Sequence, residues 1–182
     1  MGTAELTRRR QLDAALAVYA ALWTTTALAA AAVALAPGLA AHARASLRGL
    51  GMDLHPHAAT LHALLVTRLA RNMAIAAAPT EWAAIGAGRS RRWRRVVDAI
   101  LTATLLTDAG LVGVALGAYG VRLVAWLPHL PLEWAALAVG VLPWLAARRG
   151  QRRRVDLLAP LAVCFVLLLA AACVETWLTP HT

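Results

Sequence analysis

One uninterrupted run of uncharged residues restricts the fold of this chain more than any other feature. Residues 14–41, 28 in all, include no Asp, Glu, Lys, Arg or His. A bilayer core of about 30 Å needs about 20 apolar residues at the rise of an α-helix, so this run can cross one. The chain is 60% hydrophobic, whereas a soluble domain keeps nearer half of its residues apolar. The sequence therefore predicts an all-α, polytopic transmembrane helical bundle.

The basic residues are all arginine, and most of them lie between the apolar runs. The formal net charge of +9 would suit a nucleic-acid-binding protein, but such a surface also needs aromatic and polar side chains on the same element. The arginines instead cluster at 8–10, 89–95 and 148–154, beside predicted spans. Arginine in this position keeps a segment cytoplasmic and contacts anionic headgroups. We therefore expect membrane lipids, and no nucleic acid, as partners.

The apolar runs predict a single membrane domain, 1–182, with five spans. The first run resembles a signal peptide, but it is too long for one and has no clean cleavage site. Residues 42–70 are expected to form an outer loop and then, from Ala58, a short amphipathic helix at the interface. A four-span alternative, with the second segment re-entrant, leaves one arginine cluster on the wrong side. The predicted spans are about 14–36, 72–88, 96–121, 127–147 and 157–174.

The arginines also predict an orientation in the cell membrane. With five spans and a cytoplasmic N-terminus, all three clusters, 13 arginines, lie inside. The positive-inside rule then places the C-terminus outside. The five arginines left outside are Arg44, Arg48, Arg68, Arg71 and Arg122.

This topology brings polar residues of four predicted elements to the outer leaflet. Their charges nearly cancel, and each charge at membrane depth costs about 2.5–3.5 kcal/mol on insertion scales, so partners are required. We therefore expect one polar cluster; the alternative is that each side chain reaches the headgroups separately. The cluster consists of Arg71, Asn72, Arg122, Pro128, His129, Glu133 and Glu175.

Two acids and a set of glycines fall within the spans. Glu81 and Asp108 lie near the middle of the second and third spans, where they form a protonated pair, donate to a neighbouring backbone, or line an ion or proton path. The third span also carries glycines at i, i+3 and i+4 steps, which is typical of close helix packing in lipid. These glycines are Gly110, Gly113, Gly117 and Gly120.

Neither a metal site nor a catalytic site is expected. His55 and His57 flank a proline, but only Asp53 could join them as a ligand, so a solvated loop is the preferred interpretation. The only serines, Ser46 and Ser90, lie in expected loops, and a serine protease would lack its nucleophile. Phosphate-loop and zinc-protease motifs are also missing from the sequence. We therefore expect a protein that is not an enzyme and has no cofactor.

Three short motifs, in order, resemble the stage II sporulation protein M family. The family hallmark is Pro-His-Gly with a Glu three residues later and an Ala-rich span, and residues 127–133 are similar to it, with Leu130 in place of the glycine. The start of the second span looks like the family's Asn-rich start, and residues 170–180 look like its last span, which closes on Glu and Thr-Pro. The resemblance covers 60–180 and carries over Asn72, Pro128, His129, Glu133 and Glu175.

The resemblance implies a non-catalytic membrane organiser or a subunit of a multi-protein complex. The family namesake works with cell-wall hydrolases during engulfment of a developing spore, so hydrolases are the implied partners. Further copies of the chain are a separate candidate partner. The alternative is a permease-like subunit of a transporter driven by a separate ATP-binding protein, which Glu81, Asp108 and the basic loop 89–95 favour. An intramembrane enzyme would have only His129 and Glu133 for acid–base chemistry.

Overall fold

The computed structural model describes most of the chain, and every regular element in the described part is an α-helix. The predicted all-α class is therefore confirmed. The described residues are 3–49, 69–70, 72–74, 76, 78–79, 90–124, 127–148 and 158–178.

Within the residues that the structure describes, three helices are long and apolar enough to cross a membrane, judged by length and composition. They are α1 (Thr3–Ala34), α4 (Arg91–Tyr119) and α8 (Leu158–Leu178). These helices contain most of the predicted first, third and fifth spans.

The other two predicted spans have different outcomes. The second, 72–88, is described only as helical fragments up to Pro79, and the interfacial helix expected from Ala58 lies outside the described residues. The fourth, 127–147, forms two shorter helices. Five spans therefore stay a prediction, while three candidate spans are found.

The fourth predicted span is divided into α6 (Leu130–Gly140) and α7 (Leu142–Arg148). The interruption expected at Pro128 is present as a turn, but a second turn, at Val141, differs from the prediction. Pro143 accounts for this turn, because a proline inside a helix lacks an N–H and its ring clashes with the preceding turn. The apolar stretch of the two helices is consequently shorter than a full candidate span.

Helix α2 (Pro37–Gly49) corrects the loop predicted from residue 42. Pro37 occupies the first helical position, where its fixed φ is suitable and its missing N–H costs nothing. Arg44 then donates from Nη1 to the carbonyl oxygen of Ala118 at 2.7 Å, which anchors α2 to the end of α4. Packing against α4 therefore favours a helix that the glycines and polar residues of this stretch did not suggest. The buried residues of α2 are Ala40, Ala43 and Leu47.

Helices α1 and α4 approach each other closely at two glycines of α4. A Cβ on Gly113 would overlap the carbonyl oxygen of Thr26, and a Cβ on Gly117 would overlap that of Ala30. The Thr26 hydroxyl also donates across the interface to the carbonyl oxygen of Ala109, at 3.1 Å. Close backbone contact with such a hydrogen bond is how helices associate in lipid. The other two predicted packing glycines, Gly110 and Gly120, have no atom within 4 Å of a Cβ position.

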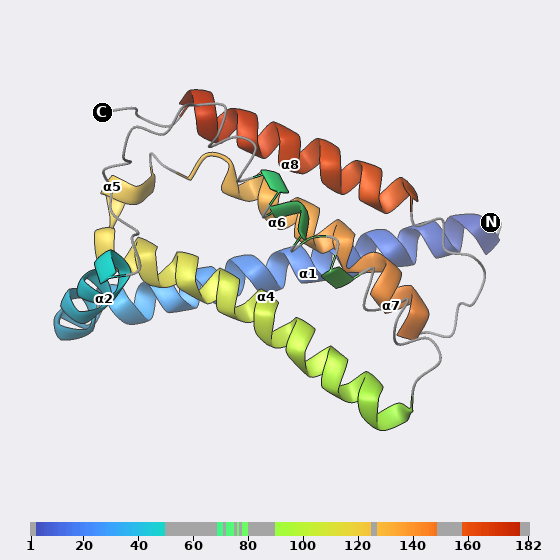
Figure 1. Ribbon diagram of the computed structural model, residues 1–182, viewed down its shortest axis with the longest axis horizontal. Helices are drawn as coiled ribbons and strands as arrows, with labels where there is room; N and C mark the ends of the chain where they lie inside the picture. Colours follow the sequence, from blue (N-terminus) through green and yellow to red (C-terminus); the bar gives the residue numbers. More distant parts are fainter. Residues whose placement is uncertain are drawn as a thin grey trace.

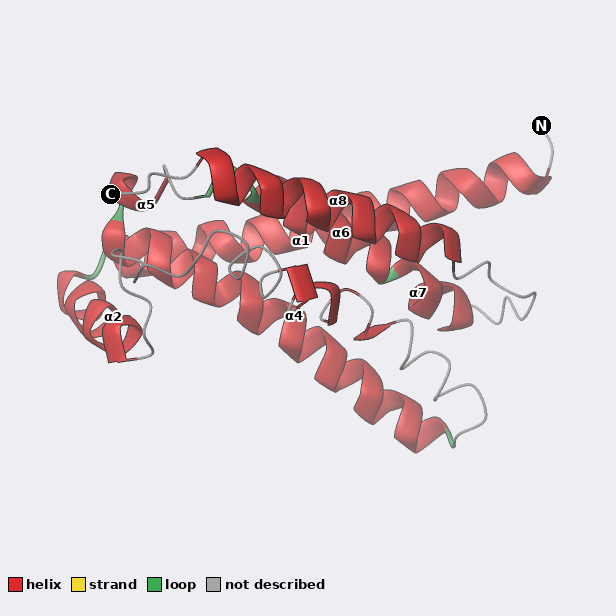
Figure 2. Ribbon diagram, turned by 45° about the horizontal axis from the view of Figure 1, so that its top comes forward, coloured by secondary structure: helices red, strands yellow, loops and turns green. Residues whose placement is uncertain are grey.

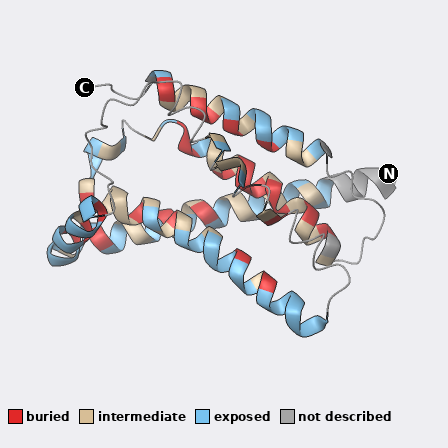
Figure 3. Ribbon diagram, in the orientation of Figure 1, coloured by how far each residue is buried: buried red, intermediate tan, exposed pale blue. Residues whose placement is uncertain are grey.

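Helix α6 lies in the interior of the bundle: six of its 11 residues are buried, and buried residues colour much of it in Figure 3. On one side it packs against α8, where the Cys164 thiol donates to the carbonyl oxygen of Ala136 at 3.2 Å. On another side the carbonyl of Ala76 lies so close to Gly140 that a Cβ there would overlap it. Helix α6 therefore contacts both α8 and the segment that contains Ala76, which are far from it in sequence.

The helices run between two ends of the molecule (Figure 1). One end holds the starts of α1, α4 and α8 and the end of α7; the opposite end holds α2 and α5 (Val121–Val124). Figure 2 confirms that α4 diverges from the other helices toward the first end. We call this first end the arginine-rich end, because its described arginines are Arg9, Arg10, Arg91, Arg92, Arg94, Arg95 and Arg148.

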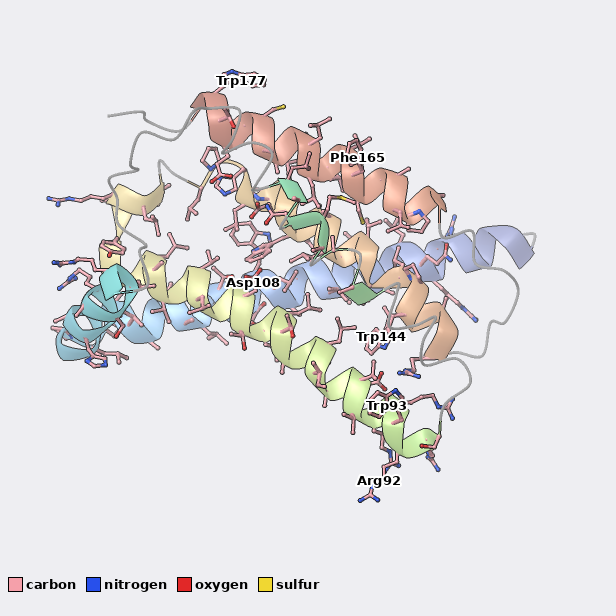
Figure 4. The ribbon with its side chains drawn as sticks, in the orientation of Figure 1. Arg92, Trp93, Asp108, Trp144, Phe165 and Trp177 are labelled. Atoms are coloured by element: carbon pink, nitrogen blue, oxygen red, sulfur yellow. The ribbon has the colours of Figure 1, made fainter. Side chains whose placement is uncertain are left out.

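Large apolar side chains cover the outside of the long helices. On the diverging half of α4, Val96 and Ile100 are exposed, and on α8 Phe165 and Val166 are exposed. Figure 4 shows Phe165 pointing away from the other helices. Such surfaces are rare on monomeric soluble proteins, whereas lipid covers them on helices that cross a membrane.

Candidate functional site

The centre of the candidate site is a His–Glu pair at the start of α6. His129 is the N-cap of the helix, and Glu133 follows one turn later, so both side chains lie on one face. His129 Nε2 lies 3.9 Å from Glu133 Oε2. The helix amino end, where the partial positive charge of the dipole is located, favours a carboxylate in the first turn. Both side chains are largely buried, with 10% and 20% of their surface exposed.

A third side chain reaches this pair from α8. Because α8 runs antiparallel to α6, the end of α8 lies beside the start of α6, and Glu175 comes next to His129. One nitrogen or oxygen atom from each of His129, Glu133 and Glu175 lies within 4.8 Å of the other two. A buried imidazole and two carboxylates thus converge from two helices.

Asn72 joins the cluster from the segment between α2 and α4. Its Nδ2 donates a hydrogen bond to Glu133 Oε1. The two oxygens of Glu133 therefore have different neighbours, because Oε1 accepts from Asn72 while Oε2 faces His129. Glu133 is consequently the residue that joins the two halves of the site.

A small cavity, lined by polar and apolar side chains, lies on the Asn72 side of Glu133. Its volume is about 20 Å³, enough for one water-sized occupant. Figure 4 shows Asp108 on α4 near the middle of the molecule, and this acid belongs to the cavity wall. The lining residues are Asn72, Asp108, Glu133, Trp134, Leu137 and Leu168.

Trp134 places a buried hydrogen-bond donor, its indole Nε1, in this region. Its side chain is 1% exposed and it lines the cavity. Within the part of the chain that the structure describes, its indole Nε1 has no hydrogen-bond partner. A buried donor of this kind costs about 1–3 kcal/mol when it is left unsatisfied. An acceptor in the cavity would remove this cost.

The predicted cluster and the observed one overlap in part. The structure brings Asn72, His129 and Glu133 together with Glu175, whereas Arg122 and Pro128 are exposed, on α5 and in the turn before α6. Arg71, Glu81, and the histidine pair His55 and His57 lie outside the described residues.

Two cavity residues are missing from the sequence-based cluster. Asp108 was predicted as a mid-membrane partner of Glu81, yet it lines the cavity with Asn72 and Glu133. Trp134 directly follows Glu133 in sequence, and this adjacency is the one signal that could have suggested it. Leu137 and Leu168 give no signal, because leucines are everywhere in these helices.

Comparison with known proteins does not add to this geometry. No protein-family model, curated protein or solved structure matches the chain. The resemblance to the stage II sporulation protein M family therefore stays a prediction, and the site is argued from its own side chains.

A second polar group lies at the arginine-rich end, between α4 and α7. Asp98 Oδ1 accepts from Trp144 Nε1 at 2.9 Å, and from Nε and Nη2 of Arg148 at 2.8 and 2.5 Å. Figure 4 shows Trp144 in the space between the two helices. All three side chains are used in holding α4 to α7, so we interpret this group as structural.

Proposed function

We propose that the protein is a non-catalytic integral membrane protein that acts as a membrane organiser or as a subunit of a multi-protein complex. The observation that carries this proposal is that the polar side chains of the candidate site link separate membrane segments to one another. Such links hold helices together, as a structural or organising role requires.

The contacts of the cluster support the same role. Glu133 on α6 is joined to Asn72 from a second segment and lies near Glu175 from a third. Buried polar contacts between membrane helices fix their relative positions. The proposed organiser is therefore a rigid bundle with apolar outer faces. Cell-wall hydrolases are the partners that the family resemblance suggests, and further copies of the chain are a second candidate partner.

The proposed orientation places the N-terminus in the cytoplasm and the C-terminus outside. Most of the described arginines favour it, because they lie at the end that holds the starts of α1, α4 and α8, while Arg44, Arg48 and Arg122 lie on α2 and α5 at the other end. Arginine-rich ends of membrane proteins stay cytoplasmic. In this orientation the polar cluster lies toward the outer leaflet, nearer the cell-wall side.

The proposal is tested by purifying the tagged full chain from its native membrane in mild detergent. We expect one or a few proteins to co-purify at a constant ratio through a second, size-based separation. Another multi-span protein of the same membrane, expressed at the same level, is the control for non-specific association. A chain that purifies alone, without partner proteins or additional copies of itself, would contradict the proposal.

A permease-like subunit is the second candidate, and one observation favours it. Asp108 and Glu133 line the same cavity, and Asp108 lies about 16 Å from the end of α4 at 1.5 Å per residue. Acids at membrane depth are typical of ion and proton paths. Co-purification of an ATP-binding protein, and ATP-dependent flux that Asp108→Asn abolishes while Asp13→Asn does not, would favour this candidate over the first.

A further inference from the structure

The side chains of the cluster are those that bind metal ions. Imidazole nitrogen and carboxylate oxygen are the ligands of zinc and related divalent ions in proteins. His129, Glu133 and Glu175 offer one such nitrogen and two such oxygens, all within 4.8 Å of one another. Two of the three come from a single helical turn, so their spacing is set by α6 itself.

The distances are close to those that one bound ion requires. Two ligands at about 2.1 Å from a tetrahedral ion are about 3.4 Å apart. His129 Nε2 and Glu133 Oε2 are 3.9 Å apart. Small rotations of the two side chains would close this difference, and Glu175 would approach the same point from α8.

Charge agrees with an ion of this class. Glu133 and Glu175 bring two carboxylates to a place where the side chains are partly buried between apolar helices. A divalent cation matches two carboxylates in charge, and the neutral imidazole of His129 adds a ligand without adding charge.

A cavity on the Asn72 side of Glu133 adjoins the cluster and has room for one water. Its lining includes Glu133 but neither His129 nor Glu175, so this water is not assigned as a ligand of the ion. Trp134 lines the cavity, is 1% exposed, and its Nε1 has no partner among the residues that the structure describes. The indole N–H can donate to the water oxygen beside the Glu133 carboxylate.

We propose that His129, Glu133 and Glu175 form a binding site for one divalent transition-metal ion, with zinc as the best fit. The imidazole ligand excludes a preference for calcium or magnesium, which take oxygen ligands. This inference goes beyond the organiser role and does not depend on it, because metal binding is measured on the purified chain without partners.

The test is a zinc titration of the full chain, purified in nanodiscs with a tag that contains no histidine and stripped with a chelator. We expect one zinc ion per chain and no competition from magnesium. His129→Gln and Glu175→Gln should each weaken zinc binding at least tenfold. His42→Gln is the matched control, because His42 is an exposed histidine on α2, and it should leave zinc binding unchanged.

Arg71 provides the sharpest alternative, since the sequence predicts it in the same cluster. A guanidinium group could neutralise the two carboxylates in place of a metal ion. If wild-type protein binds no zinc and Arg71→Gln creates the site, the proposal for the native chain is overturned. Zinc binding by the wild type that both cluster variants leave unchanged overturns it as well.

X-ray absorption at the zinc edge identifies the ligand atoms in the wild-type protein, so the proposal can be tested even if the variants do not fold. The expected first shell contains one imidazole nitrogen and oxygen atoms only. A sulfur ligand would assign the ion to Cys164 or Cys173, the two free cysteines of α8, and would overturn the proposed site.

Discussion

Arg148 binds Asp98 through two guanidinium nitrogens and so joins α7 to α4. Nε and Nη2 lie 2.8 and 2.5 Å from the same carboxylate oxygen, and Nη2 also donates to the backbone carbonyl of Arg94 at 3.2 Å. Helix α4 diverges from the rest of the bundle toward this end (Figure 1). The ion pair therefore holds the diverging half of α4 where packing by apolar side chains is sparse.

Asp98→Ala should lower stability by removing the acceptor shared by Arg148 and Trp144. Because the Arg148 and Asp98 side chains are 23% and 34% exposed, water screens the pair and we expect a loss of only about 1 kcal/mol. Thermal denaturation in detergent micelles measures this as a lower midpoint. Asp13→Ala, at an exposed position of α1, is the control and should not change the midpoint.

Gly113→Ala should destabilise the α1–α4 interface. The added methyl group would overlap the backbone of Thr26 and the Cβ of Ala29, and overpacking of this kind costs about 1–3 kcal/mol. Gly110→Ala makes the same chemical change on the same helix, but its Cβ would meet no atom within 4 Å. A titration with a denaturing detergent should therefore separate the two variants, and equal stability would contradict the proposed close packing.

The long helices could be predicted from the sequence because lipid imposes a simple requirement on it. A run such as 14–41 must bury its backbone polar groups in a helix, whatever its neighbours. The short elements obey no such rule. Helix α2 forms because it packs on α4 and because Arg44 reaches Ala118, and neither contact can be read from residues 37–49 alone.

The candidate site could also be predicted only in part: the depth of each residue in the membrane follows from the sequence, but the direction of its side chain does not. Depth can be counted at 1.5 Å per residue, and this counting placed Asn72, Glu133 and Glu175 at one level. The direction in which a side chain points depends on how each helix is rotated against its neighbours. Sequence periodicity leaves this rotation open in helices that are apolar all round, so Asp108 and Trp134 were not assigned to the cavity.

Asn72 and Glu133 should show a favourable coupling energy in a double-mutant cycle. The amide of Asn72 donates to the Glu133 carboxylate between two membrane segments, and such bonds contribute about 1 kcal/mol in membrane proteins. We expect the Asn72→Ala and Glu133→Ala double variant to lose less stability than the sum of its single variants. The distant pair Asn72→Ala and Asp98→Ala is the control and should be additive. Additivity in both pairs would refute the coupling.

Arg44→Ala should loosen α2 from the end of α4. The Arg44 guanidinium satisfies the carbonyl of Ala118 in the last turn of α4, where the helix dipole also favours a cation, so its removal should cost about 1 kcal/mol. Hydrogen exchange of the α2 amides should rise. Arg48→Ala removes the same charge from an exposed position of α2 and should leave exchange unchanged; equal increases would show that charge alone matters.

Reporter fusions should find the C-terminus and the segment 89–95 on opposite sides of the membrane. Helix α4 starts and α8 ends at opposite ends of the bundle (Figure 1), and the arginines of 91–95 belong on the cytoplasmic side. A periplasm-active enzyme fused after Thr182 should be active, while the same enzyme inserted at 89–90 should be inactive. Activity at both sites would mean that the segment 89–95 and the C-terminus lie on the same side of the membrane. The polar cluster of Glu133 and Glu175 could then no longer be assigned to the outer leaflet.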